Sequence, residues 1–318
     1  MKNISLRILL VLSLLLGFGT VGTVGAEAAS VQIEQWTGNS FTFLPLSSAQ
    51  NIGYEIFTEE NADQGFQGNQ SVRIPYAQYV GKQVTMNEVV PFTDNDNKKD
   101  YIVHMTVNDT GEKLVGRSMR GQLAGLVLTD DLINARQQFL GKTVYPKFRE
   151  LPGLYVAGAI AQPVAIKIGG PVTVVDVYAG DQSQEPINLV VSVNEQKAIL
   201  PIAYSWTNSP VQPWAQKAPW ENALFMDNPR NGLMGSNELW NKIETGVVEE
   251  NMTKEQVNLS WGKPFSIESN DSVWIYGTKK LSFEGDVLHS IETIPGILSE
   301  TPVVTPVVIV VVTPTESK

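Results

Sequence analysis

Alternating hydrophobic and polar positions predict β-strands along most of this chain. Residues 101–108 and 187–194 are the clearest cases, because apolar side chains recur at about every second position, the period of a half-buried strand. Turn residues follow each run, and no long helical pattern stands between residues 29 and 207. The pattern therefore predicts a mostly β protein up to residue 207, followed by a segment of a different kind.

Residues 252–264 carry a helix whose start is marked in the sequence. Thr253 is a favourable N-cap, and Gln256 stands where its side chain reaches back to the cap backbone, as in a capping box. Met252 and Val257 occupy the two positions of a hydrophobic staple, which fixes how the chain enters a helix. The pattern predicts a short helix that begins after Thr253.

The same helix has a predicted end and a predicted buried face. Val257 and Trp261 are four residues apart, so they share one face that packs on a neighbour. Gly262 favours the left-handed conformation that ends a helix, and Pro264 cannot continue it. Together with Thr253, these residues form the structural motif of the segment.

A second helix and three strands complete the unit. Ser236 caps a predicted helix over residues 237–245, in which Trp240 and Ile243 share one face and Gly246 is the stop. The sequence predicts strands at residues 272–276, 281–283 and 287–291. Two amphipathic helices on one face of a small antiparallel sheet form an α+β unit.

The sequence MTKEQVNLSWGKP, followed by WIYG and LSFEGDVLHSI, resembles the BamE-like (SmpA/OmlA) domain. The shared signature is a Met-Thr-Lys-x-x-Val helix, a Gly-x-Pro break and a Trp-x-Tyr strand, and the resemblance covers roughly residues 220–294. It implies an extracytoplasmic interaction domain, best known from an outer-membrane assembly lipoprotein and related in shape to proteinaceous β-lactamase inhibitors. Such domains bind other proteins and catalyse no reaction.

With that resemblance, we expect partner contacts at exposed positions around the second helix and the strand after it. The candidate partner-binding residues are Lys254, Glu255, Asn258, Lys263 and Trp274. The apolar residues of the two helices are expected in the core, so their loss should unfold the domain and not merely weaken binding.

A duplication precedes this unit. Residues 79–84 (Tyr-Val-Gly-Lys-Gln-Val) and 139–144 (Phe-Leu-Gly-Lys-Thr-Val) share one pattern. Each follows a short amphipathic turn, at residues 75–78 and 134–137. Each is followed, after an insertion, by an alternating strand, a turn and another strand, so we interpret the two segments as an internal repeat. We expect two small SH3-like barrels, with Gly81 and Gly141 at positive φ where the chain enters a strand.

The whole arrangement resembles secreted bacterial proteins that place SH3-like β modules before a terminal BamE-like domain, a group without an established activity. The predicted segments are a signal peptide at 1–28, β modules at 29–125 and 126–207, a Pro/Trp connector at 208–220, the BamE-like domain at 221–295, and a Val/Thr/Pro-rich tail at 296–318. In the connector, Trp214 and Trp220 either pack against a domain or form an exposed partner-binding pair. The tail is expected to be extended or to add an edge strand.

The N-terminus indicates export. Lys2 and Arg7 precede an apolar stretch, and residues 26–28 (Ala-Glu-Ala) offer small side chains for cleavage, so we expect a signal peptide cleaved near residue 28. The alternative is an uncleaved anchor, because the uncharged stretch after Arg7 is just long enough for a membrane helix. The chain has no cysteine and therefore no lipobox, so it is not expected to be a lipoprotein. These features predict a periplasmic or secreted protein.

The charge balance excludes two classes of partner. The chain has a formal net charge of −10, and the predicted signal peptide carries more basic than acidic residues, so the remainder is more acidic still. Nucleic acid and anionic lipid both require a basic face. We expect neither as a partner.

No motif assembles a catalytic or metal site. His104 and His289 each stand without a second histidine nearby, which favours structural or surface roles. Residues 94–100 begin like a calcium loop, but Lys99 replaces its glycine and Met105 its bidentate carboxylate. We therefore expect no cofactor, no metal ion and no enzymatic activity.

The expected function is that of an exported, non-catalytic protein-binding or adaptor protein of the bacterial cell envelope. One alternative is peptidoglycan binding through the SH3-like modules, which needs exposed aromatic side chains around Tyr101, Tyr145 or Trp206. A second alternative is inhibition of an extracytoplasmic hydrolase. A carboxylate-based hydrolase is the enzyme alternative, and it needs two acidic side chains that converge in one cleft.

Overall fold

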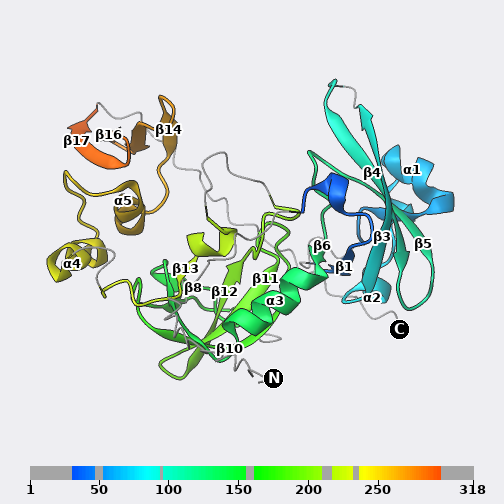
Figure 1. Ribbon diagram of the computed structural model, residues 1–318, viewed down its shortest axis with the longest axis horizontal. Coiled ribbons are helices and arrows are strands. Elements are labelled where there is room, and N and C mark those ends of the chain that lie inside the picture. The colour runs from blue at the N-terminus through cyan, green and yellow to red at the C-terminus, as the bar shows by residue number, and fades with distance from the viewer. Residues whose placement is uncertain are drawn as a thin grey trace, which may run out of the picture.

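A computed structural model describes residues 31–46, 53–93, 96–154, 161–209, 217–231 and 236–294 (Figure 1). Strands predominate over helices in these ranges, so the predicted mostly β fold is confirmed. No helix among the described residues has the length and apolar character to cross a membrane. The predicted signal peptide, the predicted tail and Trp214 lie outside the described residues.

A six-stranded antiparallel sheet forms the first β module, which is blue to green in Figure 1. Its strands, in spatial order, are β2 (Ile56–Thr58), β5 (Lys113–Arg117), β4 (Lys99–Val107), β3 (Gln83–Thr93), β1 (Ser40–Phe43) and β6 (Leu126–Leu128). The alternation predicted around residues 101–108 is present, since Tyr101, Val103, Met105 and Val107 of β4 are all buried. Successive strand residues point to opposite faces, so β4 gives one whole face to the core.

Short helical segments lie along this module. They are η1 (Ile33–Gln35), η2 (Glu59–Asn61), α1 (Ala62–Phe66), η3 (Gln70–Val72) and α2 (Tyr76–Tyr79). Helix α1 crosses Phe57 of β2 at Gly65, where an added Cβ would come within 2.4 Å of the Phe57 ring. Helix α1 therefore reaches the sheet only because residue 65 has no side chain.

A five-stranded antiparallel sheet forms the second β module. Its strands, in spatial order, are β12 (Gln196–Ile202), β11 (Ile187–Val193), β10 (Val172–Ala179), β7 (Thr143–Pro146) and β13 (Leu224–Phe225). After β7, the chain forms a hairpin of β8 (Glu150–Leu151) and β9 (Val164–Ala165), and Gly153 bridges to Ala198 of β12. This bridge brings the chain leaving β7 to the opposite edge of the sheet.

Helix α3 (Thr129–Phe139) packs on the second sheet against β10. It has 11 residues, whereas the sequence predicts only a short turn at 134–137. The helix buries only two apolar side chains, Ala135 and Phe139, so its helical period is weak in the sequence. Trp220, in the short helix η4 (Pro219–Asn222), packs edge-on against Phe139 with 5.4 Å between ring centroids. This connector tryptophan therefore packs on the second module.

Both sheets extend past the segment limits proposed from the sequence. Strand β6 follows the limit at 125/126 but pairs with β1, and β13 follows the limit at 220/221 but pairs with β7. These strands have only three and two residues, too few for a readable alternation.

The two repeated turns have the same local geometry. Gly81 and Gly141 have φ of 76° and 75°, as predicted, and their N–H groups donate to the carbonyls of Phe43 and Val174 at 3.0 and 2.8 Å. The strands that follow differ, because β3 pairs directly with β4, whereas β10 separates β7 from β11. The repeat is therefore preserved at the turn and in the hairpins β4–β5 and β11–β12, and it diverges between them.

The C-terminal unit, yellow to orange in Figure 1, has two helices and a four-stranded meander. The helices are α4 (Asn237–Thr245) and α5 (Lys254–Trp261), and the strands are β14 (Ser266–Glu268), β15 (Val273–Tyr276), β16 (Lys279–Glu284) and β17 (Val287–Thr293). The prediction of three strands is wrong by one, because β14 was not anticipated. None of the three residues of β14 is buried, so the strand has no hydrophobic alternation to read.

The predicted start of α5 is confirmed. Thr253 Oγ1 accepts the N–H of Gln256 at 3.2 Å, and Gln256 Oε1 accepts the N–H of Thr253 at 2.8 Å. Met252 and Val257 are buried as the staple requires. Gly262 ends the helix with φ of 79° and an extended ψ of −164°, so the chain leaves directly toward β14 instead of through a left-handed turn.

The end of α4 and the predicted core residues are also confirmed, with one exception. Gly246 ends α4 in the left-handed conformation. Trp240, Ile243 and Val257 are buried, whereas Trp261 is only partly buried. Trp240 and Ile243 do not pack only within their own unit, because they form a cluster with Ile168 of the second module.

That cluster belongs to the second junction, our name for the contact of α4 and α5 with Lys147, Arg149 and Ile168. The guanidinium of Arg149 donates to the carbonyls of Ile243 and Glu244 at 2.6 and 2.7 Å, and to that of Ser260 at 3.1 Å. The last carbonyls of a helix lack partners within the helix. Arg149 therefore holds the C-terminal ends of α4 and α5 with one side chain.

An ion pair completes the second junction. Lys147 Nζ lies 2.6 Å from Glu255 Oε1, and Lys217 Nζ lies 3.5 Å from the other oxygen. Burial acts to raise the pKa of Glu255, but the two ammonium groups lower it overall. Glu255 is therefore an ionised partner of the second module.

Candidate functional site

Most of the predicted partner-binding residues are engaged within the chain. Lys254 pairs with Asp271 at 2.9 Å, and Glu255 belongs to the second junction. Trp274 is buried, with only 7% of its surface exposed, so its prediction as an exposed contact is wrong. Asn258 and Lys263 are exposed. These five residues do not form one available surface.

The core position of Trp274 has a clear cause. Its indole Nε1 donates to Asp271 Oδ1 at 2.6 Å, and its ring packs on Phe283 with 4.9 Å between centroids. The Trp-x-Tyr strand is therefore a packing feature of the C-terminal unit.

The aromatic residues named for wall binding do not form an exposed shelf. Tyr101 is buried and donates its hydroxyl hydrogen to Glu34. The Trp206 indole donates to the carbonyl of Lys217 at 3.1 Å, and Tyr145 is partly buried in β7. Among the described residues, no cluster of His, Cys, Asp and Glu could hold a metal ion.

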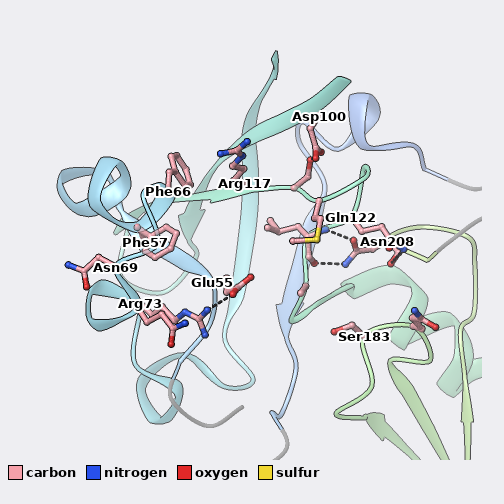
Figure 2. Close-up of a pocket in the computed structure, with 18 residues that line it drawn as sticks. Glu55, Phe57, Phe66, Asn69, Arg73, Asp100, Arg117, Gln122, Ser183 and Asn208 are labelled. Atoms are coloured by element: carbon pink, nitrogen blue, oxygen red, sulfur yellow. Dashed lines mark hydrogen bonds and ion pairs between the residues drawn. The ribbon is translucent and has the colours of Figure 1, made fainter. Parts of the chain in front are cut away.

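A groove of about 550 Å³ lies where the two β modules meet (Figure 2). Phe57, Phe66 and Arg73 of the first module lie on one side, and Ser183 and Asn208 of the second module lie on the other. Its lining mixes aromatic, amide and charged side chains. A concave site with a few polar groups beside apolar side chains is the usual form of a binding site. The sequence did not predict this groove.

The first wall of the groove is aromatic. Phe57 and Phe66 pack edge to face with 5.6 Å between ring centroids. Phe57 is buried beneath α1, whereas Phe66 is partly exposed. Because Gly65 allows this close packing, Phe66 is held as a rigid apolar surface at the groove.

The turn at residues 118–121 is held by one buried carboxylate. Asp100 accepts hydrogen bonds from the Ser118 hydroxyl and from the N–H groups of Tyr101, Arg120 and Gly121, the last three at 3.0 to 3.3 Å. Both carboxylate oxygens are used. Asp100 therefore fixes the shape of this turn at the groove, and its hydrogen-bonding capacity is used by groups of the same chain.

The opposite wall is fixed by the first junction, our name for the contact of Asn208 and Thr207 with the first module. Asn208 Oδ1 accepts the N–H of Leu123 at 2.8 Å, and Asn208 Nδ2 donates to the carbonyls of Leu123 and Leu126 at 2.7 and 3.0 Å. Thr207 Oγ1 accepts the N–H of Val31 at 3.0 Å. A side-chain amide thus pairs with the backbone of the first module as another peptide group would.

Two arginines line the groove and differ in their partners. Arg73 forms an ion pair with Glu55 inside the groove. The guanidinium carbon of Arg117 lies over the Phe92 ring, 4.6 Å from its centroid, and no carboxylate among the described residues pairs with it. The groove therefore contains one neutralised and one available guanidinium.

Comparison with known proteins identifies no relative, because no protein-family model, curated protein or solved structure matches the chain. The resemblance to BamE-like domains stays a prediction.

Proposed function

We propose that this chain is an exported, non-catalytic binding protein of the cell envelope, and that it binds a segment of a partner protein in the groove between its two β modules. The observation that carries the proposal is the lining itself. An apolar surface at Phe66 and an available guanidinium at Arg117 lie in one concavity. Such a lining can hold a side chain and a charged group of the same extended segment.

The fold also supports a proposal for the type of each unit. We infer that the β modules are SH3-like barrels, because the chain after β7 returns to β12 through the bridge at Gly153. We infer that the C-terminal unit is BamE-like, because two capped helices precede an antiparallel meander. Peptide binding between β modules agrees with both.

Site-specific crosslinking tests the proposed function. A photoreactive amino acid replaces Met119, which lines the groove and is 70% exposed, or Ile133, which is 47% exposed on α3 and does not line it. After irradiation in the cell envelope, we expect a protein adduct from position 119 that is absent from position 133. A further Phe66→Ser change should reduce that adduct.

Two outcomes contradict the proposal. Equal labelling from both positions would mean that the groove has no special role. Co-sedimentation of the full chain with purified peptidoglycan, without a position-119 protein adduct, would favour wall binding instead.

A second surface favours the inhibitor alternative. Phe265, just before the edge strand β14, is 80% exposed, and Ile267 within β14 is 45% exposed. An exposed edge strand with apolar side chains is suited to pairing with a strand of another protein. Inhibition of an extracytoplasmic hydrolase should then be lost in Phe265→Ser while the position-119 adduct is unchanged.

A further inference from the structure

We infer that the ligand of the groove is an acidic peptide segment, and that Arg117 binds one of its carboxylates beside an apolar side chain seated against Phe66. This inference rests on the proposed function, since it names the chemistry of the segment that the groove accepts. Arg117 and Phe66 both line the groove and lie near each other in Figure 2.

The use of arginine elsewhere in the structure sets Arg117 apart. Four of the described arginines have protein partners: Arg73, Arg136 and Arg230 in ion pairs, and Arg149 with three carbonyls. Within the described ranges, the guanidinium groups of Arg117 and Arg120 form no ion pair, although the backbone N–H of Arg120 bonds to Asp100. Only Arg117 of these two lines the groove. Arg117 is therefore a cation at the groove that no acidic side chain of the described residues neutralises, in a chain with a net charge of −10.

The acidic residues that line the groove already have partners within the chain. Asp100 gives both oxygens to the Ser118 hydroxyl and three backbone N–H groups, and Glu55 pairs with Arg73. These contacts hold both carboxylates on other partners, and neither carboxylate pairs with Arg117. A carboxylate from a ligand therefore meets an unpaired guanidinium.

Arg117 is also prepared for a planar anion. Its guanidinium lies over the Phe92 ring, which restricts the side chain before any ligand binds. A guanidinium held over a ring face can still donate two N–H groups to one carboxylate. Lysine would supply the charge but not this planar fork of donors.

The apolar half of the site is on the same groove. Phe66 is partly exposed and Met119 is 70% exposed, so both offer surface that a ligand side chain would cover. Covering such apolar surface is favourable because it removes the surface from water. The preferred segment therefore carries an aromatic or aliphatic residue next to an acidic one.

The test compares two fluorescein-labelled peptides, Ser-Phe-Glu-Phe-Glu-Ser and Ser-Phe-Gln-Phe-Gln-Ser, by fluorescence anisotropy with the full chain. We expect the Glu peptide to bind about tenfold more tightly, the ratio that one charge-assisted contact supplies. In Arg117→Gln the affinity for the Glu peptide should fall to that for the Gln peptide. Arg117→Lys should retain only part of the preference.

Arg136→Gln is the matched control, because Arg136 is an exposed arginine that does not line the groove. It should leave both affinities unchanged, and urea unfolding curves should show that every variant is folded under the conditions of the binding assay. Equal binding of both peptides would overturn the inference but leave the groove as a peptide site. Binding of neither peptide would overturn the inference, and the crosslink from position 119 would then decide the proposed function separately.

Discussion

The two junctions of this protein join their units in opposite ways. The first junction uses neutral groups, since Asn208 and Thr207 bond to backbone atoms of the first module. The second junction uses charges and apolar packing, with Lys147, Arg149 and Glu255 around a buried cluster. Only the first junction borders the groove.

The difference has a physical consequence for binding. At the second junction the charged side chains neutralise each other or cap helix ends, so they are not available to a ligand. At the first junction the amide–backbone pairing fixes the two modules without consuming the charge of Arg117. A neutral junction can thus be rigid and still leave a guanidinium free at its border.

The largest expected effect is that of Asn208→Asp. The change puts an oxygen in place of the nitrogen that donates to the carbonyls of Leu123 and Leu126, so two bonds become repulsive contacts. We expect unfolding free energy in urea to fall by about 3 kcal/mol. Asn194→Asp is the control, because Asn194 is exposed and also has positive φ, and it should change stability by less than about 0.5 kcal/mol. An equal loss of stability in both variants would show that the positive-φ backbone conformation, and not the amide pairing, determines the effect.

At the second junction, Arg149→Gln should cost about 2 kcal/mol. It removes the charged donor that serves three helix-end carbonyls. The control Arg136→Gln breaks a pair with Asp176 in which both side chains are about half exposed, and it should cost less than about 1 kcal/mol. Urea unfolding monitored by tryptophan fluorescence measures both. A loss no greater than that of the control would contradict the assigned role of Arg149.

A pH experiment tests the hydrogen bonds that link Asp131 through Ser205 to Thr207 of the first junction. Asp131 accepts the hydroxyl hydrogen of Ser205 at 2.6 Å, and Ser205 Oγ accepts the N–H of Thr207 at 3.1 Å. Burial raises the pKa of Asp131 to about 6, although the bonds from Ser205 act against it.

The raised pKa means that the folded state favours the protonated carboxyl. Its stabilising contribution is present below the pKa of an unfolded aspartate, about 4, and is lost as the pH rises through about 6. Relative to Asp131→Asn, the unmodified chain should lose about 2 kcal/mol of stability over this window. The control Asp181→Asn changes an exposed aspartate that does not act on the pKa of Asp131, and it should keep the pH dependence. A flat difference between the Asp131 variant and the unmodified chain would contradict the prediction.

The smallest effect is expected from Lys217→Gln. This lysine is 57% exposed at 3.5 Å from Glu255, so its loss should cost less than about 0.5 kcal/mol. Lys147→Gln should lower the stability more than Lys217→Gln, because Lys147 is only 11% exposed and lies 2.6 Å from the same carboxylate. Similar urea midpoints for the two variants would contradict the ranking.

The sequence predicted local features better than their assembly. The cap at Thr253, the stop at Gly246 and the glycines at 81 and 141 were readable because each depends on a few consecutive residues. Strand β14 and helix α3 were missed or shortened because neither shows the hydrophobic period of its class. The repeat was found at its turns, whereas the insertion of β10 beside β11 depends on pairing between distant strands.

The groove could not be predicted for a related reason. Phe66 and Arg117 come from distant parts of the first module, and Asn208 joins them at the groove only because the two modules are in contact. No short motif marks any of them. One residue type gave a local indication. Asparagine tolerates positive φ, and Asn208, at the start of the predicted connector, has a φ of 56°.

Asn208 also gives the first junction a chemical lifetime. Asparagine side chains hydrolyse slowly to aspartate and are among the thermolabile groups of proteins. Here that reaction would turn the donor to Leu123 and Leu126 into an acceptor, so an ageing molecule would loosen at the groove. The second junction rests on lysine, arginine and glutamate, which do not undergo this change. In old protein the border of the proposed ligand-binding groove would therefore loosen while the C-terminal unit stays attached.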